Sequence, residues 1–162
     1  MTTTTHRRLP DQRIAHRIGD PEGRFPIFSD AGARLFSGRW HVAGDPVIYA
    51  AEHYSLAMLE KLAHFSGFPP SGQHRVEITL PAGLSYEVFA EHQALDWRAP
   101  DSPGAQAFGH AWVQEQRSVL LLVPSALAPI EHNILINTAH PDFARITCGL
   151  ETPIWWDDRL FG

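Results

Sequence analysis

The segment from Ser118 to Val123 most constrains the fold of this chain, because after its first residue it is apolar without interruption. Such a run lacks the alternation of a half-exposed strand and is typical of a strand buried on both faces. Pro124 and Ser125 follow it directly and are expected to end it. The sequence therefore predicts a sheet in which this segment is a central strand.

Shorter segments with strand or helix character lie on both sides of this run. The further predicted strands are Arg13–Ile18, Pro46–Ala51, Gln73–Leu80, Ser85–Phe89, Asn133–Asn137 and Ile154–Phe161. The predicted helices run from Ser55, as N-cap, to about Phe65, over Gly104–Gln116 and briefly at His140–Phe143, whereas residues 25–38 are expected to form an irregular loop. Strands outnumber helices and do not alternate with them regularly, which favours an α+β fold with a mixed sheet and flanking helices.

The length of 162 residues predicts one domain, residues 13–162, after a flexible tail at residues 1–12. The start of the chain has no apolar stretch, so neither a secretory signal nor a membrane span is expected. Cys148 is the only cysteine, which excludes an intramolecular disulfide and is typical of a reducing compartment. We therefore expect a cytoplasmic protein, and the net charge of −5 argues against direct binding to nucleic acid.

Several common catalytic motifs are missing from the sequence. No glycine-rich phosphate loop follows a predicted strand, no G-x-S-x-G elbow occurs, and the ten histidines include no H-E-x-x-H pair. Cys148 lacks the surroundings of a catalytic cysteine. We therefore expect no metal and no resident cofactor.

Three residues at intervals of about ten form the strongest candidate site. Arg39 follows Gly38, Tyr49 lies near the end of a predicted strand, and Glu60 lies within a predicted helix. Taken singly, each has an ordinary structural explanation: a surface arginine, a core tyrosine and a solvated glutamate. Taken together, a cation, an aromatic face and a carboxylate are the groups that hold a dinucleotide and assist the breaking of a glycosidic bond.

The motifs around these residues resemble those of a known family in both order and spacing. They are Arg17-Ile18, Gly32-Ala33, Gly38-Arg39-Trp40, Gly44 to Ala50, Leu56 to Glu60, Pro124-Ser125, and Asn133 and Asn137 with His140 to Phe143. Over residues 13 to 146 the chain resembles the RES-domain toxins, whose three letters would fall on Arg39, Glu60 and Ser125. Ser37 and His41 depart from the frequent family pattern Gly-Gly-Arg-Trp-Asn.

The resemblance implies a fold similar to ADP-ribosyltransferases and diphtheria-type toxins, and a toxin of a type II toxin–antitoxin module. It also implies an Xre-like helix-turn-helix antitoxin as partner, and the toxin could form a homodimer within that complex. The implied substrate is NAD⁺. On this view Glu60 stabilises the developing charge on the ribose and Tyr49 stacks on nicotinamide. Arg39 and Arg17 hold the pyrophosphate, Ser125 offers its hydroxyl to the ligand or to Glu60, and Asn133 positions polar groups.

Alternatives for the reaction stay open at this point. NAD⁺ could be cleaved by water or by phosphate, or its ADP-ribose could pass to a protein target, because the outcome depends on which acceptor reaches the anomeric carbon. A catalytically silent binding module on the same fold is a further alternative, which the retention of Arg39, Glu60 and Ser125 disfavours.

Overall fold

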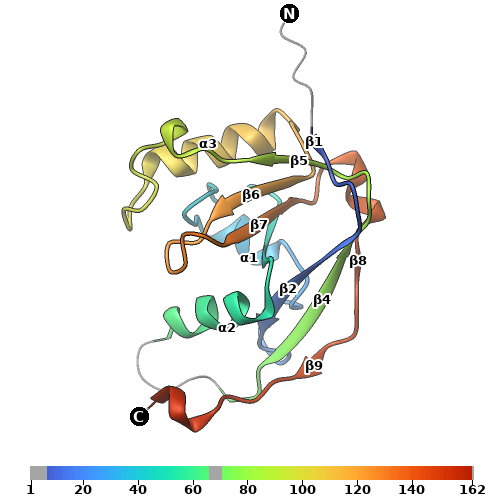
Figure 1. Ribbon diagram of the computed structural model, residues 1–162, viewed down its shortest axis with the longest axis vertical. Helices are drawn as coiled ribbons and strands as arrows, with labels where there is room; N and C mark the ends of the chain where they lie inside the picture. The colour runs from blue at the N-terminus through green and yellow to red at the C-terminus, as the bar shows by residue number, and fades with distance from the viewer. Residues whose placement is uncertain (1–6, 66–70, 162) are drawn as a thin grey trace, which may run out of the picture.

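The computed structural model describes residues 7–65 and 71–161, and these contain one mixed sheet with flanking helices (Figure 1). The strand order is β1-β5-β6-β7-β3-β2-β4-β8, with β9 paired to β4. The strands are β1 (Arg7–Arg8), β2 (Arg13–Gly19), β3 (Val47–Ala51), β4 (His74–Leu80), β5 (Ser85–Val88), β6 (Leu120–Pro124), β7 (His132–Asn137), β8 (Thr147–Cys148) and β9 (Thr152–Pro153). Only β5 and β6 pair in parallel among the described strands, so the predicted α+β class with a mixed sheet is confirmed.

The apolar run of the sequence forms β6, which lies between β5 and β7 and is buried at every position. Leu121 and Val123 share a core with Trp112 of helix α3 (Pro103–Gln114). The alternate residues, Leu120 and Leu122, share a second core with β2 and β4. Both faces of β6 are therefore covered, one by a helix and one by the other half of the same sheet, which explains why its sequence does not alternate.

Two helices cover different parts of the sheet. In Figure 1, α3 lies above β6 and β7, and α2 (Tyr54–Ala63) lies below them. Helix α2 packs Leu56 and Ala57 against Ile18 of β2 and Ala51 of β3. The remaining helical segments are short: α1 (Ala31–Leu35), η1 (Glu91–Gln93), η2 (Pro141–Arg145) and η3 (Asp158–Phe161). No helix in the described part of the chain is long and apolar enough to cross a membrane.

The sheet is split between β2 and β3. Strand β2 pairs with β4 over its whole length, and β3 pairs with β7 over its whole length. By contrast, β2 and β3 pair only at His16 and Ala51. The two strands diverge beyond that pair, and α2 packs at the point of divergence. This split opens the space in which the candidate site lies.

Three local predictions are wrong. Residues 154–161 form no strand, because the chain leaves the sheet after Pro153, buries only Ile154 and ends in η3. The irregular loop at 25–38 contains α1. Helix α2 begins after His53, whose extended backbone makes the N-cap, so Ser55 lies inside the helix.

Part of the segment predicted to be a flexible tail, residues 1–12, belongs to the sheet and the core. Residues 1–6 lie outside the described residues. Arg7 and Arg8 pair with β5, and Leu9 is buried in the core shared with β4 and β6. The described part of the fold therefore begins at residue 7, before the predicted boundary at residue 13.

Candidate functional site

The split between β2 and β3 forms the floor of a cleft with two connected lobes. The first, which we call the β2 lobe, is a cavity of about 250 Å³ between β2, β3 and α2. The second, the loop lobe, is a cavity of about 520 Å³ that extends to Gly38–Trp40, Pro100, Pro124, Ala126 and Leu127. The two lobes share a wall made of Arg17, Tyr49, Glu60, His64 and Asn133. Together they have the size of a typical ligand site.

The structure brings five of the six predicted site residues to this cleft. Arg17, Tyr49, Glu60 and Asn133 line both lobes, and Arg39 lines the loop lobe. The sixth, Ser125, is fully buried behind them. They come from β2, the loop before β3, β3, α2, the end of β6 and β7, so their meeting depends on the sheet and not on sequence spacing.

Glu60 is held through one of its two carboxylate oxygens. Ser125 Oγ and Asn133 Nδ2 each donate a hydrogen bond to Glu60 Oε1 at 2.7 Å. Within the described residues, no group donates to Oε2. Ser125 Oγ also accepts hydrogen bonds from the backbone N–H groups of Leu127 and Ala128, at 3.1 Å each. Ser125 therefore donates its single hydroxyl proton to Glu60. The sequence left the ligand and Glu60 open as partners of this hydroxyl, and in the structure the partner is Glu60.

Arg17 bridges the split in the sheet. Its Nε donates to the carbonyl of Ile27 at 2.6 Å, and its Nη1 donates to the carbonyl of Tyr49 at 2.7 Å. Because β2 and β3 do not pair at Tyr49, the arginine satisfies a carbonyl that a neighbouring strand would otherwise satisfy. Burial lowers the pKa of the Arg17 guanidinium, but an arginine stays protonated in proteins.

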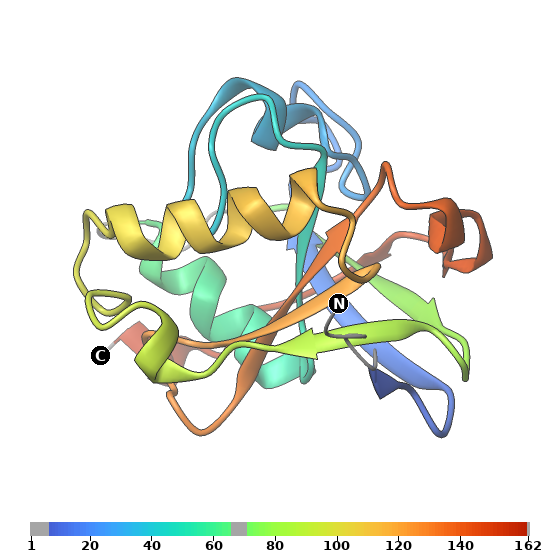
Figure 2. The same cartoon turned by 90° about the horizontal axis from the view of Figure 1, so that it is seen from above.

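Arg39 lies on a loop that is packed tightly against its surroundings. Its Nη1 donates to the carbonyls of Trp97 and Ala99, at 2.5 and 2.7 Å. A Cβ at Gly38 would lie 2.8 Å from His41 and 3.0 Å from the Tyr49 hydroxyl, so only glycine fits there. This loop also lies next to α3 (Figure 2), where the backbone of Trp40 approaches Gly109 too closely for any side chain.

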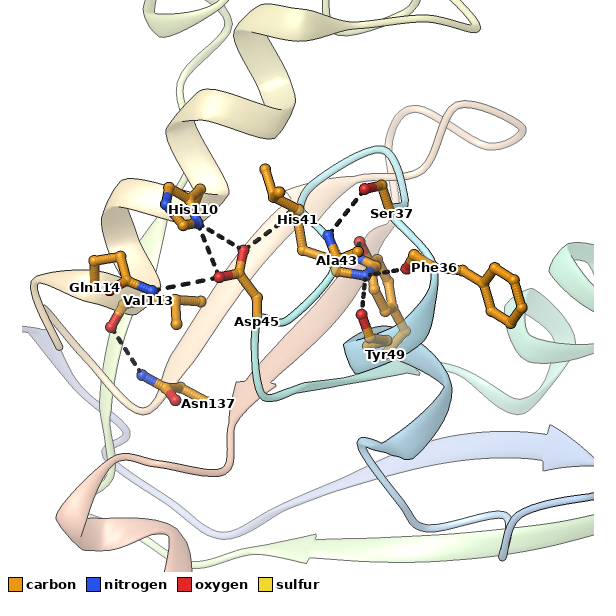
Figure 3. Close-up of polar contacts among 12 residues, drawn as sticks. Phe36, Ser37, His41, Ala43, Asp45, Tyr49, His110, Val113, Gln114 and Asn137 are labelled. Atoms are coloured by element: carbon orange, nitrogen blue, oxygen red, sulfur yellow. Dashed lines mark hydrogen bonds and ion pairs between the residues drawn. The ribbon is translucent and has the colours of Figure 1, made fainter.

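Tyr49 lines both lobes of the cleft, and its hydroxyl points toward this loop (Figure 3). The hydroxyl lies 2.7 Å from His41 Nδ1 and accepts a hydrogen bond from the Trp40 N–H at 3.2 Å. His41 Nε2 faces the carbonyls of Phe36 and Ala33, so Nε2 carries a proton. In neutral His41 the Nδ1 is then an acceptor for the Tyr49 hydroxyl. Burial raises the pKa of Tyr49, which keeps that hydroxyl protonated.

A buried carboxylate fixes the turn before β3. Asp45 accepts hydrogen bonds from the Val42 N–H at 2.9 Å and from His110 Nδ1 at 2.8 Å, with Gln114 at 3.4 Å (Figure 3). His110 and Gln114 belong to α3. The turn that leads from Arg39 to Tyr49 is thereby tied to the helix, which sequence analysis did not predict.

Three further titratable residues line the cleft that the sequence did not point to: His16, Lys61 and His64. His64 follows Glu60 by four residues and is the C-cap of α2 with helical backbone angles, so both side chains lie on one helix face; this spacing was the available signal. Lys61 is the only lysine of the chain. Burial, with repulsion from Arg17, lowers the pKa of Lys61.

The cleft carries more positive than negative charge, although the whole chain has a net charge of −5. Arg17, Arg39 and Lys61 line it against one carboxylate, Glu60. This imbalance favours an anionic ligand. Over residues 7–65 and 71–161, no three His, Cys, Asp or Glu side chains are grouped to hold a metal ion.

The chain is similar in sequence to several named toxins over most of its length. A "Prs ADP-ribosylating toxin" of Sphingobium sp. is 42% identical over 137 residues, which cover 82% of this chain and 85% of that protein. A "Toxin Res" of Photorhabdus laumondii is 34% identical over 72% of this chain and 76% of its own length. A "Toxin Res" of Pseudomonas putida is 36% identical over 82% of this chain and 92% of its own length.

A solved structure shares the fold. The toxin–antitoxin complex MbcT–MbcA of M. tuberculosis contains a chain that superposes with a TM-score of 0.68 at 18% identity, covering 91% of this chain and 86% of that one. The sequence profile of the RES domain matches residues 14–157, nearly the whole chain, so this protein belongs to the RES domain family.

Proposed function

We propose that this protein is a toxin that consumes NAD⁺ by breaking the bond between nicotinamide and ribose. The observation that carries the proposal is the arrangement of Glu60. Its carboxylate lies in the wall common to both lobes, is held at Oε1 by Ser125 and Asn133, and keeps Oε2 without a donor among the described residues. Such a preorganised carboxylate suits a reaction in which positive charge develops on a sugar.

The reaction needs little more than this charge stabilisation. When the glycosidic bond breaks, its electron pair stays with the ring nitrogen, and the pyridinium becomes neutral nicotinamide. The ribose carbon takes on oxocarbenium character, which the Glu60 carboxylate stabilises while it accepts hydrogen bonds from the ribose hydroxyls. The acceptor then attacks that carbon and gives up a proton. The leaving group departs from a ring that is already cationic, so no metal is needed.

The other cleft residues take supporting roles in this proposal. Tyr49 lines both lobes, and in this proposal its ring stacks on nicotinamide. Its hydroxyl is occupied by His41 and by the Trp40 N–H, so stacking and not proton transfer is its role. Arg17 and Arg39 keep N–H groups beyond those bound to backbone carbonyls, and these can meet the pyrophosphate.

The fate of the ADP-ribose has two candidates. Transfer to water or phosphate would deplete NAD⁺, and transfer to a protein would make the enzyme a mono-ADP-ribosyltransferase. The second candidate draws support from the Sphingobium relative, which is named an ADP-ribosylating toxin. The first draws support from the two lobes, which leave the space around Glu60 open to a small acceptor.

Labelled NAD⁺ separates these outcomes. Purified protein is incubated with NAD⁺ labelled in the adenylate half, with and without cell extract, and the label is followed. Free ADP-ribose or its phosphate ester supports cleavage, and label bound to a protein band supports transfer. A protein that leaves NAD⁺ intact in both mixtures would be the silent binding module.

We also propose an Xre-like helix-turn-helix antitoxin as partner. Support comes from the solved MbcT–MbcA structure, which is a toxin–antitoxin complex. The test is to co-express the chain with the product of its neighbouring reading frame. Co-purification with loss of NAD⁺ consumption is expected, and chromatography with light scattering on that complex would show whether two toxin chains are present. A neighbour product that neither binds nor inhibits would contradict the partner.

A further inference from the structure

One face of α2 is turned toward the cleft. Ala57, Glu60, Lys61 and His64 all line the β2 lobe. Their spacing of three, four and seven residues is that of a single helical face. Glu60 and His64 also reach the loop lobe, whereas Lys61 lines only the β2 lobe. The same turn of helix therefore presents a carboxylate at the junction of the lobes and an ammonium group inside one of them.

The ammonium group of Lys61 makes no close ion pair with a described residue, and the carboxylate that attracts it, Asp20, lies beyond ion-pair distance. Among the described residues, no carboxylate lies within 4.0 Å of Nζ, and the nearest ring contact is Phe65, with Nζ 5.5 Å from the ring centroid. The side chain is half-buried, so the charge is only partly hydrated. A solvated surface lysine can also lack an ion-pair partner, but its charge is fully hydrated, whereas that of Lys61 is not.

Arg17 adds a second cation to the same lobe. It uses Nε and Nη1 for the carbonyls of Ile27 and Tyr49, and Nη2 makes no hydrogen bond with any described residue. Two like charges that share a partly buried cavity repel each other, and this repulsion has a cost for folding. An anion bound between them would remove it.

His16 completes the lobe. It lies on β2 one residue before Arg17, and its Nδ1 is buried without a hydrogen-bond partner in the described part of the chain. A buried polar atom without a partner is uncommon in a folded protein and often marks a site that is completed by a ligand or water. The β2 lobe thus combines two cations that form no ion pair with a described carboxylate and one histidine nitrogen without a hydrogen-bond partner.

We propose that Lys61, together with Arg17, forms a subsite in the β2 lobe for a phosphate group of the dinucleotide. The inference rests on the proposed NAD⁺ substrate and deepens it by naming where the phosphate lies. With the phosphate there, the ribose bound to nicotinamide reaches Glu60 at the junction, and the nicotinamide ring extends along Tyr49. Lys61 is then a substrate-binding residue.

The experiment compares Lys61→Gln with Lys61→Arg, which keeps the charge, and with Arg13→Gln. Arg13 lies on the same strand as Arg17, is exposed and lines neither lobe, so its replacement removes one positive charge without touching the cleft. Titration calorimetry measures the binding of ADP-ribose, inorganic pyrophosphate and adenosine. Thermal unfolding confirms that each variant is folded.

Lys61→Gln is expected to weaken ADP-ribose and pyrophosphate about tenfold, the loss that follows from one charge-assisted hydrogen bond, and to leave adenosine unchanged. In NAD⁺ consumption, KM should rise by a similar factor while kcat changes little. Lys61→Arg and Arg13→Gln should remain close to wild type. Wild-type affinity of Lys61→Gln for ADP-ribose would overturn the subsite, and so would an equal loss for adenosine.

The outcome also separates this inference from the proposed function. If wild type consumes NAD⁺ and Lys61→Gln has the same KM, only the subsite is wrong. If wild type does not consume NAD⁺, the proposed function is wrong, and the pyrophosphate titration still decides whether Lys61 binds a phosphate group.

Discussion

At the scale of single residues, the site depends on the two hydrogen bonds that orient the Glu60 carboxylate. Its Oε1 receives two donors, and one of them, Ser125, is itself fixed by two backbone N–H groups. The carboxylate is therefore oriented before any ligand binds. Preorganisation of this kind lowers the barrier of a reaction because no reorganisation is needed when charge develops.

Ser125→Ala tests this orientation. The change removes one of the two donors to Glu60, so kcat for NAD⁺ consumption should fall by about tenfold, while KM changes little, since Ser125 lines neither lobe. It should also lower the free energy of unfolding by about 1–3 kcal/mol, because the N–H groups of Leu127 and Ala128 lose their acceptor. Steady-state kinetics and urea unfolding measure the two effects.

Ser118→Ala is the matched control. Ser118 is another fully buried serine, which accepts from Trp112 Nε1 and donates to the carbonyl of Leu120, away from the cleft. It should lose stability and keep kcat. Equal losses of kcat in the two variants would show that Ser125 acts only through stability.

His16 predicts a pH dependence of stability. Burial lowers the pKa of His16, and Arg75 and His53 add to this, while Glu77 opposes it. Below the ordinary histidine pKa of about 6.5, His16 is protonated in the unfolded chain but stays neutral in the folded chain, because its pKa is lower there. The free energy of unfolding should therefore fall as the pH is lowered from about 7.5 through this range, and His16→Gln should make that fall shallower. Chemical unfolding at several pH values measures it, and parallel curves for the two proteins would contradict it.

At the scale of elements, helix α3 and the loop of Arg39 are one packed unit. A Cβ at Gly109 would lie 1.6 Å from the carbonyl oxygen of Trp40, far inside a van der Waals contact. Asp45 ties the following turn to His110 on the same helix. Helix α3 therefore contributes no predicted site residue and yet holds Arg39 in place.

Gly109→Ala tests this packing. Alanine would ordinarily favour a helix by about 1 kcal/mol over glycine, but here it should destabilise the protein by at least ~1–3 kcal/mol through overpacking, and it should reduce NAD⁺ consumption by displacing the Arg39 loop. Gly32→Ala is the control, because Gly32 also lies in a helix and its nearest neighbour to a new Cβ is 4.0 Å away. A stable and active Gly109→Ala protein would show that the loop does not depend on this contact.

The sequence predicted the elements better than their boundaries and their meeting points. Periodicity and apolar runs depend on local residues, so β2, β4 and β6 could be predicted. Two features could not be predicted in this way: the start of α2 at Tyr54 and the lack of a strand at 154–161. Both depend on contacts with the sheet that local residues do not reveal. The same holds for the site. Glu60 could be predicted from its motif, whereas the role of Lys61 depends on its position beside β2, which the sequence does not reveal.

At the scale of the whole molecule, one sheet folds over itself and opens along a single seam. Alternate residues of β6 and β7 share a core with β2 and β4, so the two halves of the sheet face each other. The halves are joined through β2 and β3, which pair at one position only. The cleft occupies this seam, and it is lined by cations although the chain as a whole has a negative net charge. The fold itself therefore creates the place for an anionic substrate.

The most direct test of this account is NAD⁺ consumption by purified wild type and Glu60→Gln, with both shown to be folded by thermal unfolding. We expect wild type to release nicotinamide, and Glu60→Gln to be slower by about 10²–10³, the loss typical of one preorganised electrostatic group. Glu60→Gln keeps the size of the side chain and removes its charge. Equal rates for the two proteins, or intact NAD⁺ with wild type, would contradict the account.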